Sequence, residues 1–157
     1  MASRSEIEPS EVIVRRAERA DLLAVYRIEK AVFEQPWPYS AFEGFLEEPN
    51  FLVASVEERV VGYVVADVTP NVGRDLGHIK DLAVSPDAQG NGIGRTLLQR
   101  AVVGLTVAGA SRIKLEVRRS NERAISLYRA AGFEATRLLP RYYDDGESAL
   151  IFVYDAS

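Results

Sequence analysis

A glycine-rich turn at residues 89–94, Gln-Gly-Asn-Gly-Ile-Gly, has the clearest chemical potential in the sequence. It lies between the apolar segment 78–84 and a segment of helical periodicity, 92–108. Glycines leave the backbone bare where the first N–H groups of a helix have no partner inside the helix, and the helix dipole there favours an anion. The turn therefore predicts a phosphate site, with Arg95 as an added cation. A turn that binds nothing is the alternative.

Two other phosphate motifs do not fit this turn. A P-loop requires a lysine followed by serine or threonine after its last glycine, and no lysine follows here. A dinucleotide fingerprint has the spacing G-x-G-x-x-G near the first strand of an alternating unit. Here the spacing is G-x-G-x-G, and several predicted strands precede it.

Acid–base chemistry has two candidates in the predicted strands. Glu116 lies in segment 112–117, where apolar and polar residues alternate, so it shares a face with Lys114. Such a glutamate is ordinarily a solvated surface residue, but a carboxylate near the centre of a sheet can have a raised pKa that suits a general base. His78 is the only histidine, and histidine is the residue type whose unperturbed side chain changes charge near neutral pH, although a lone histidine is more often structural.

The composition excludes several classes of site. The chain has no cysteine, so disulfides, thiolate metal sites and a cysteine nucleophile are excluded. One histidine excludes a multi-histidine site, and we predict no metal. The net charge of −4 gives no overall basic field for nucleic acid.

Length and hydropathy indicate the type of protein. With 157 residues, 47% of them hydrophobic, we expect a flexible tail at 1–11 and one domain at 12–157. No apolar run reaches the length of a membrane span, and the first residues lack the apolar core of a signal peptide. We expect a cytoplasmic protein that binds neither membrane nor nucleic acid; nothing in the sequence assigns an oligomeric state.

The candidates are positioned by alternating strands and helices. The spacing predicts strands at 12–17, two within 51–68, and at 78–84, 112–117, 133–139 and 148–155, with helices at 21–33, 41–48, 92–108 and 121–132 and a loop at 69–77. The crossover from 78–84 to 112–117 makes those two strands parallel. The predicted fold class is α/β: a single mixed, mostly antiparallel sheet with one central parallel pair and helices on both faces.

Five stretches resemble the GCN5-related N-acetyltransferases, the GNAT superfamily. The turn matches the signature Q/R-x-x-G-x-G/A, and Leu-Glu-Val-Arg-Arg-Ser-Asn and Leu-Tyr-Arg-Ala-Ala-Gly-Phe follow in order within 115–133. These, with Gly-His-Ile-Lys-Asp-Leu-Ala-Val and the late Arg-Tyr-Tyr-Asp-Asp-Gly-Glu-Ser-Ala, are similar to RimI and archaeal Ard1-type protein N-terminal acetyltransferases. The resemblance covers residues 12–154 and implies a GNAT sheet and direct acetyl transfer from acetyl-CoA in a ternary complex.

The resemblance also implies a role for each matching residue. Glu116 is the general base, acting through water with support from His78, and Tyr128 is the general acid for the leaving thiolate. The Val84 N–H polarises the thioester carbonyl between two splayed strands. The residues implied to bind acetyl-CoA are Leu82, Ala83, Val84, Gln89, Gly90, Asn91, Gly92, Ile93, Gly94, Arg95, Asn121 and Tyr128. Asn121 is independently a plausible helix N-cap.

Two aromatic segments are predicted to form a groove for a peptide amino terminus. They contribute Glu34, Trp37 and Tyr39 from the first segment, and Tyr142 and Tyr143 from the second. Their hydroxyls and apolar faces suit a peptide backbone and its first side chain, although exposed aromatics that shield the core are the alternative. Trp37 and two prolines depart from the family's archaeal first loop and resemble bacterial RimI.

The predicted function is acetylation of protein or peptide N-termini, with ribosomal proteins among the candidate substrates. An α-amine has a pKa of about 8, so it needs less help to lose its proton than a lysine at about 10.4. A small-amine acetyltransferase, acting on a polyamine or antibiotic through Asp144, Asp145 and Glu147, is one alternative. A non-catalytic acyl-CoA-binding module is the other, against which the pairing of Glu116 with Tyr128 argues.

Overall fold

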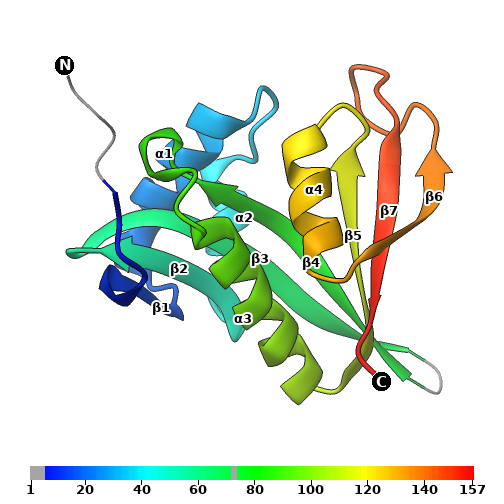
Figure 1. Cartoon of the computed structure of the whole chain (residues 1–157), viewed down its shortest axis with the longest axis horizontal. Helices are drawn as coiled ribbons and strands as arrows, with labels where there is room; N and C mark the ends of the chain where they lie inside the picture. Colours follow the sequence, from blue (N-terminus) through cyan, green and yellow to red (C-terminus); the bar gives the residue numbers. More distant parts are fainter. Residues whose placement is uncertain (1–5, 72–73) are drawn as a thin grey trace.

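The computed structural model describes residues 6–71 and 74–157 (Figure 1). Its strands are β1 (Val12–Arg16), β2 (Asn50–Val56), β3 (Arg59–Asn71), β4 (Arg74–Val84), β5 (Ala110–Arg118), β6 (Glu134–Leu139) and β7 (Ala149–Asp155). Its α-helices are α1 (Leu22–Val32), α2 (Tyr39–Glu43), α3 (Ile93–Val107) and α4 (Glu122–Ala130). Every predicted strand and helix is present, in the predicted order.

All seven strands form one sheet in the order β1-β2-β3-β4-β5-β7-β6. Only β4 and β5 are parallel neighbours, and every other adjacent pair is antiparallel. The crossover through α3 connects the parallel pair. The predicted fold class, including its central parallel pair, is confirmed.

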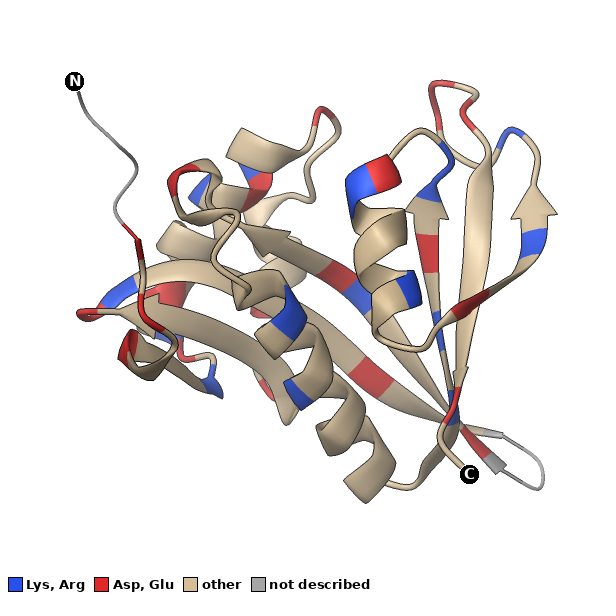
Figure 2. Cartoon of the chain, viewed as in Figure 1, with Lys and Arg blue, Asp and Glu red and all other residues tan. Residues whose placement is uncertain are grey.

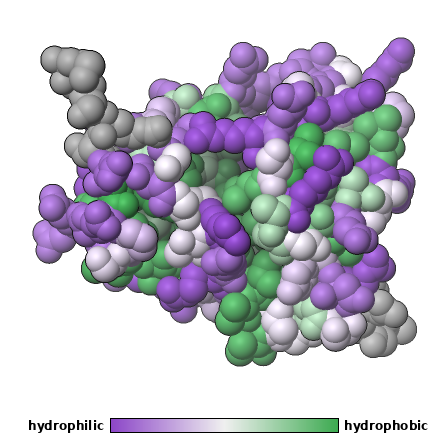
Figure 3. All heavy atoms as spheres, in the orientation of Figure 1, coloured by the Kyte–Doolittle hydropathy of each residue, from purple (hydrophilic) through white to green (hydrophobic). Residues whose placement is uncertain are grey.

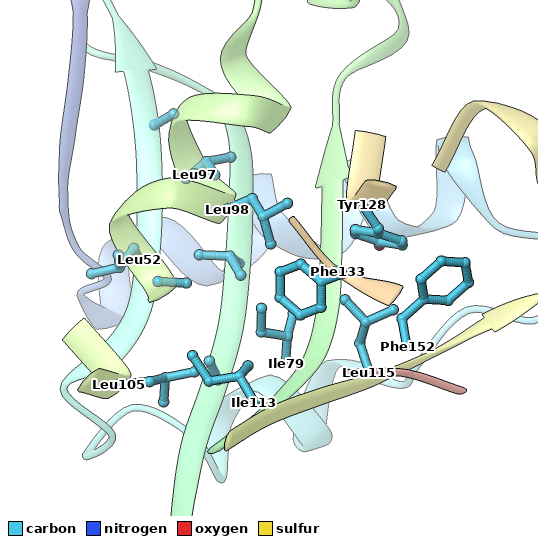
Figure 4. Packing of buried hydrophobic residues seen from close by; sticks show 14 of the residues in the cluster. Leu52, Ile79, Leu97, Leu98, Leu105, Ile113, Leu115, Tyr128, Phe133 and Phe152 are labelled. Carbon is cyan, nitrogen blue, oxygen red and sulfur yellow. The ribbon is translucent and has the colours of Figure 1, made fainter. Parts of the chain in front are cut away.

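Helices cover both faces of the sheet and create two apolar cores. On one face, leucines of α3 pack with residues of β4 and β5, and Figure 4 shows Leu97, Leu98 and Leu105 among Ile79 and Ile113. On the other face, α1 and α2 cover a second cluster that includes Phe42, Phe51 and Tyr63. Because the middle of the sheet is covered on both sides, β2 is almost entirely buried and reads as a continuous apolar run.

The feature that shapes the site is a fork between β4 and β5. Their pairing ends at His78↔Lys114, although β4 continues to pair with β3 as far as Val84. In Figure 1 the two strands meet near the C-terminus and diverge toward α4. The splay that the resemblance implied is therefore present in the backbone.

A β-bulge lies on β4 at the fork. Val65 pairs with Asp81 and Ala66 pairs with Ile79, which leaves Lys80 as the extra residue. A bulge changes the face to which the following side chains point. It lets Ile79 enter the core under α3 while Asp81 contacts Tyr63 on the opposite face.

Two predicted boundaries are wrong. The predicted loop 69–77 is the end of a long β3–β4 hairpin, whose described pairs include Thr69↔Leu76 and Val68↔Gly77. Pro70 is tolerated in β3 because β2 ends its pairing at Ala66, so β3 is an edge strand there. The helix predicted at 41–48 is the shorter α2, followed by turns before Pro49.

The N-terminal segment is only partly described. Residues 1–5 of the predicted tail lie outside the described residues, and the division at residue 12 stays a prediction. Within the described part, Pro9–Glu11 forms a 3-10 turn. The Ile7 N–H donates to Asn91 Oδ1 at 3.1 Å, so this segment contacts the glycine turn.

The surface has mixed charge (Figure 2), and apolar side chains are exposed near the end of α3. Acidic and basic residues are interspersed in Figure 2. Figure 3 shows a largely hydrophilic face with an apolar area over the last turns of α3, where Val103 is 60% and Val107 83% exposed. Within 6–71 and 74–157, no helix has the length and apolar character needed to cross a membrane.

Candidate active site

The two predicted acid–base residues meet at the fork. His78 Nε2 lies 2.7 Å from Glu116 Oε2, and both side chains are partly exposed, at 21% and 16%. The strand register explains this contact, because His78 and Lys114 are the last paired residues and Glu116 is two residues further along β5. The resemblance implied that His78 supports Glu116, and the structure brings the two side chains into direct contact.

The pKa of Glu116 is lowered, which contradicts the predicted rise. Burial raises this pKa, but the hydrogen bond from His78 and the charges of His78 and Lys114 lower it by more. Lys114 Nζ lies 3.6 Å from Glu116 Oε1. Glu116 is therefore already ionised at neutral pH and can accept a proton there.

The edge of β4 beyond the last parallel pair directs two backbone N–H groups toward the fork, of which the Leu82 N–H also donates to Asp81 Oδ1 at 2.9 Å. The Ser85 N–H donates to Val61 on β3, so strand alternation directs the Ala83 N–H to β3 and those of Leu82 and Val84 to the opposite edge. That edge faces β5 beyond the last parallel pair. The structure thus places these two N–H groups where an extended polar ligand can add to the sheet edge.

The glycine turn opens α3 with positive φ values, as its composition predicts. Gly90 has φ 82° and Gly92 has φ 78°, a left-handed conformation that glycine adopts without steric cost. Gly92 is the N-cap, and no side chain caps the helix. The first backbone hydrogen bond returns from Thr96 to Gly92, leaving the N–H groups of the first turn directed outward as an anion site.

The end of β4, the start of α3 and α4 converge at Gly94. A Cβ on Gly94 would lie 3.6 Å from both Leu127 of α4 and Val84 of β4. The turn is therefore next to the edge of β4 at the fork and to the helix that carries Tyr128.

The remaining predicted donor-binding residues differ in what their side chains offer. Ile93 is buried in the core, so only its backbone is available, whereas Arg95 is exposed. Asn91 is occupied within the protein, donating to Ala88 O at 3.0 Å and accepting from Ile7. Gln89 Nε2 donates to Val84 O at 3.0 Å, which fixes the turn against β4.

Asn121 is the N-cap of α4, as its residue type predicts. Its Oδ1 accepts from the Ala124 N–H at 3.2 Å. This cap begins the helix that carries Tyr128, which is 8% exposed and packs against Phe133 and Phe152. The side chain of Tyr128 is therefore held in one place by the core.

The environment of Tyr128 keeps its hydroxyl protonated. Burial raises its pKa well above the ordinary value of 10, and the charges of Asp81 and Tyr143 add to the rise. A proton donor must hold its proton until the transition state. The burial of Tyr128 satisfies that requirement at neutral pH.

Replacing Tyr128 tests this role. We expect Tyr128→Phe to lower kcat by ~10²-fold, because a positioned acid contributes ~10²–10⁴ to such a step. Steady-state kinetics with a peptide substrate measures the loss, and the core contacts with Phe133 and Phe152 remain. A kcat within threefold of the parent value, which corresponds to a change of ~0.6 kcal/mol in activation free energy, would show that Tyr128 is not the acid.

The two aromatic segments differ in how much they are committed to the core. Trp37 is partly buried against Phe42 and Phe45, and Tyr39 lies edge-on to Tyr26, whereas Glu34 is exposed. Their predicted contact with substrate stays a prediction.

Tyr142 and Tyr143 lie closer to the acid–base pair. The two rings pack edge-to-face at 5.0 Å, and Tyr142 is 49% exposed. Burial, followed by the charge of Glu116, raises the pKa of Tyr142. Burial raises the pKa of Tyr143 to about 12, with Glu116 among the charges that contribute. The second segment is therefore within electrostatic reach of Glu116.

Arg118 was missed in the sequence and joins the two aromatic segments. Its guanidinium lies 4.1 Å from the Tyr143 ring centre and donates to Gln35 Oε1 at 3.1 Å. It also donates to Asp145 at 2.8 Å and to Glu147 at 2.9 Å. Its position two residues after Glu116, on the same strand face, was the available signal.

A second missed group is buried beneath the fork. Glu29 of α1 is 2% exposed and accepts from the Tyr63 hydroxyl, which also lies 3.4 Å from Asp81 Oδ2. These residues come from three elements with no shared motif. The signal available in the sequence was Glu29, an acidic residue at a position where the helical spacing predicts an apolar one.

Comparison with known proteins decides the family. The model of the GNAT acetyltransferase family matches residues 21–133. An uncharacterized N-acetyltransferase of Methanocaldococcus jannaschii is 39% identical over 145 residues, covering 90% of each chain. The chain belongs to the GNAT acetyltransferase family.

Two further relatives place this GNAT acetyltransferase among enzymes of related name. The ribosomal protein bS18-alanine N-acetyltransferase of Escherichia coli K12 is 33% identical over 143 residues, covering 89% of this chain and 95% of its own. The crystal structure of Ard1 from Thermoplasma volcanium has a TM-score of 0.85 and 26% identity, covering 92% of this chain and 97% of its own. The fork, the glycine turn and the contact of Glu116 with His78 are thus features of a member of the GNAT family.

Proposed function

We propose that this protein transfers the acetyl group of acetyl-CoA to the α-amino group of protein N-termini. The observation that carries the proposal is the contact of Glu116 with His78 at the fork, where β4 stops pairing with β5. The name of the E. coli relative, which acts on the alanine of a ribosomal protein, supports an N-terminal protein substrate.

The backbone at the start of α3 and along the end of β4 suits acetyl-CoA as the donor. The uncapped first turn of α3, with glycine at 90, 92 and 94, suits the diphosphate, because N–H groups and the helix dipole bind anions there. The Leu82 and Val84 N–H groups suit the carbonyl oxygens of the pantetheine arm. Acetyl-CoA, when bound, supplies an acyl group activated as a thioester.

The direction of β4 supports one order for these two N–H groups along the donor. The strand runs from His78 to Val84 and then enters the glycine turn, so Leu82 is the one nearer the base and Val84 the one nearer the phosphates. We therefore assign the thioester carbonyl to the Leu82 N–H, in place of the Val84 N–H that the resemblance suggested. An N–H aimed at this oxygen stabilises the charge that develops on it.

The chain's side chains supply the proton transfers. Glu116, ionised and supported by His78, accepts a proton from the nitrogen of the neutral amine as that nitrogen attacks. The amine nitrogen forms a bond to the acetyl carbon, and the carbon–sulfur bond breaks. Tyr128 donates its proton to the departing thiolate, so the products are the acetylated amine and the free thiol.

The acidic residues that favoured a small-amine substrate are largely committed. Asp145 and Glu147 both accept from Arg118, so their charge is compensated within the protein. Asp144 alone of the three has an exposed side chain without such an ion pair among the described residues. A polyamine site is therefore poorly supported, whereas an extended peptide suits the aromatic segments.

A peptide panel tests the proposal. We expect acetylation of peptides with a free amino terminus, an alanine-initiated peptide included, and none of the same peptides when the amino terminus is blocked and a lysine is present. Mass spectrometry with labelled acetyl-CoA locates the acetyl group. Activity confined to the blocked lysine peptides, or to free polyamines, would reject an N-terminal substrate.

A further inference from the structure

Arg118 lies on the same face of the sheet as Glu116, and the proton transfers above do not use it. The two residues are two positions apart on β5, so their side chains leave the strand on one face. Such neighbours are about 7 Å apart, which is the length of about two residues of an extended peptide. A peptide that enters between the aromatic segments and brings its amino group to Glu116 therefore has its first backbone carbonyls near Arg118.

Two carboxylates and an aromatic ring hold one end of the guanidinium in place. Nη1 donates to Asp145 Oδ2 at 2.8 Å and to Glu147 Oε1 at 2.9 Å, and Cζ lies 4.1 Å from the centre of the Tyr143 ring. The turn that carries these partners is closed by its own backbone, because the Tyr143 N–H donates to Glu147 O and the Gly146 N–H donates to Tyr143 O. Since the arginine fork is planar and rigid, these contacts fix the direction of Nη2.

The other end of the guanidinium reaches across the fork. Nη2 donates to Gln35 Oε1 at 3.1 Å. Gln35 belongs to the α1–α2 connection, in which Phe33 and Trp37 pack with residues of β2, β3 and β4, whereas Arg118 is on β5. The contact therefore joins the two sides of the fork at the point where the two predicted substrate segments approach each other.

The acceptor that Arg118 meets there has the chemistry of a peptide. The side chain of Gln35 ends in an amide, and its Oε1 is a carbonyl oxygen like that of a backbone amide. Gln35 is exposed and the Arg118 side chain is 26% exposed, so a ligand can reach both. A hydrogen bond between exposed groups has a small net free energy, because water competes for both partners. A peptide carbonyl can therefore replace the carbonyl of Gln35 at little cost.

We propose that Arg118 is a binding residue for the acceptor: its Nη2 donates to a backbone carbonyl within the first two residues of the peptide, at the place that Gln35 Oε1 occupies in the free protein. The inference rests on the proposed function, because it needs a peptide whose amino group lies at Glu116. It makes Gln35 a competitor of the substrate and not a wall of the groove.

Substitutions of Gln35 test the competition. Gln35→Ala removes the competing oxygen, so we expect the KM of the peptide to fall by ~3–10-fold with kcat within about twofold of the parent value, since one exposed hydrogen bond contributes about that factor. Gln35→Glu places a carboxylate against the guanidinium, and this stronger acceptor should raise the KM by ~3-fold or more. Steady-state kinetics at saturating acetyl-CoA measures both changes.

Arg118→Met removes the donor and keeps the length of the apolar stem. We expect the KM of the peptide to rise by ~10–100-fold, because a hydrogen bond from a charged donor contributes about that factor, while the dissociation constant of acetyl-CoA stays unchanged. Arg119→Met is the matched control, because Arg119 is the exposed neighbour and its replacement changes the net charge equally. It should change neither constant.

The combined variants separate competition from support of the fold. In an Arg118→Met background, Gln35→Ala should leave the KM unchanged, because the donor for which Gln35 competes is gone. Hydrogen exchange at the Tyr143 and Gly146 amides reports on the turn without enzymatic activity, and Gln35→Ala should not change it. Faster exchange in Gln35→Ala would make Gln35 a support of the turn and overturn the competition.

The kinetic outcomes distinguish this inference from the proposed function. A protein that acetylates no peptide would reject the proposed function, whatever the exchange experiment showed. In a protein that does acetylate peptides, three results would each overturn the inference: a KM that Gln35→Ala raises or leaves unchanged, a KM that Arg118→Met leaves unchanged, or an effect of Gln35→Ala that persists without Arg118.

Discussion

Glu116→Gln should lower kcat by ~10²–10⁴-fold, because a positioned general base contributes about that much. The amide keeps the size of the side chain but cannot accept the substrate proton. Glu116 is on β5, away from the glycine turn, so we expect the dissociation constant of acetyl-CoA to change little. Stopped-flow or steady-state kinetics, together with calorimetric titration of acetyl-CoA, measures both quantities.

Glu134→Gln is the control for this substitution. Glu134 is an exposed carboxylate on β6, and its replacement should leave kcat unchanged. If Glu116→Gln retained full kcat, or lost donor binding in proportion to activity, Glu116 would not be the base.

The pH dependence of the parent enzyme follows from the lowered pKa of Glu116. Because this pKa lies below the ordinary 4.5, the base is ionised throughout the neutral range. The rise of kcat/KM with pH therefore reflects loss of the substrate's own proton, centred near the α-amine pKa of about 8. Peptides whose amine pKa values differ should shift this limb correspondingly.

Gly92→Glu should weaken binding of coenzyme A by ~100-fold. Two like charges about 6 Å apart at an effective dielectric constant of about 20 repel by about 3 kcal/mol. No heavy atom outside the neighbouring residues lies within 4 Å of a Cβ built on Gly92, so the effect comes from charge and not from crowding of the fold. Calorimetric titration with coenzyme A measures the change.

Gly146→Glu is a matched control for backbone strain. Gly146 also has a positive φ, 88°, and open space around its Cβ, but lies in the β6–β7 connection. Both variants carry a similar conformational cost, and only Gly92→Glu should lose coenzyme affinity. Equal affinity in the two would show that the diphosphate does not bind at the start of α3.

Local sequence patterns predicted the elements and the backbone of the site. Alternation and helical spacing are set by neighbouring residues, so the strands, the α3 and α4 helices and the Asn121 cap were correctly predicted. The glycine turn was predictable for the same reason, because a positive φ is a property of single residues.

Properties that depend on distant residues were not predictable in this way. The lowered pKa of Glu116 depends on His78, which is 38 positions away. The buried cluster joins residues 29, 63 and 81 from three elements, and the bulge at Lys80 that re-aims Asp81 has no mark in the sequence. The extension of β3 past Ala66 could not be predicted, because Pro70 is compatible with a strand only where β2 no longer pairs with β3.

The fork also affects how firmly the two portions of the sheet are joined. Among the described residues, the backbones of β4 and β5 are joined at four pairs, so one portion of the sheet is held to the other by this short stretch of pairing and by the packing of α3. A ligand lying in the fork completes hydrogen bonding that the chain itself leaves open, and it stabilises the folded state by mass action. Bound acetyl-CoA should therefore raise the melting temperature and slow amide exchange along both strands. The donor would then contribute to the stability of the folded sheet as well as to the reaction.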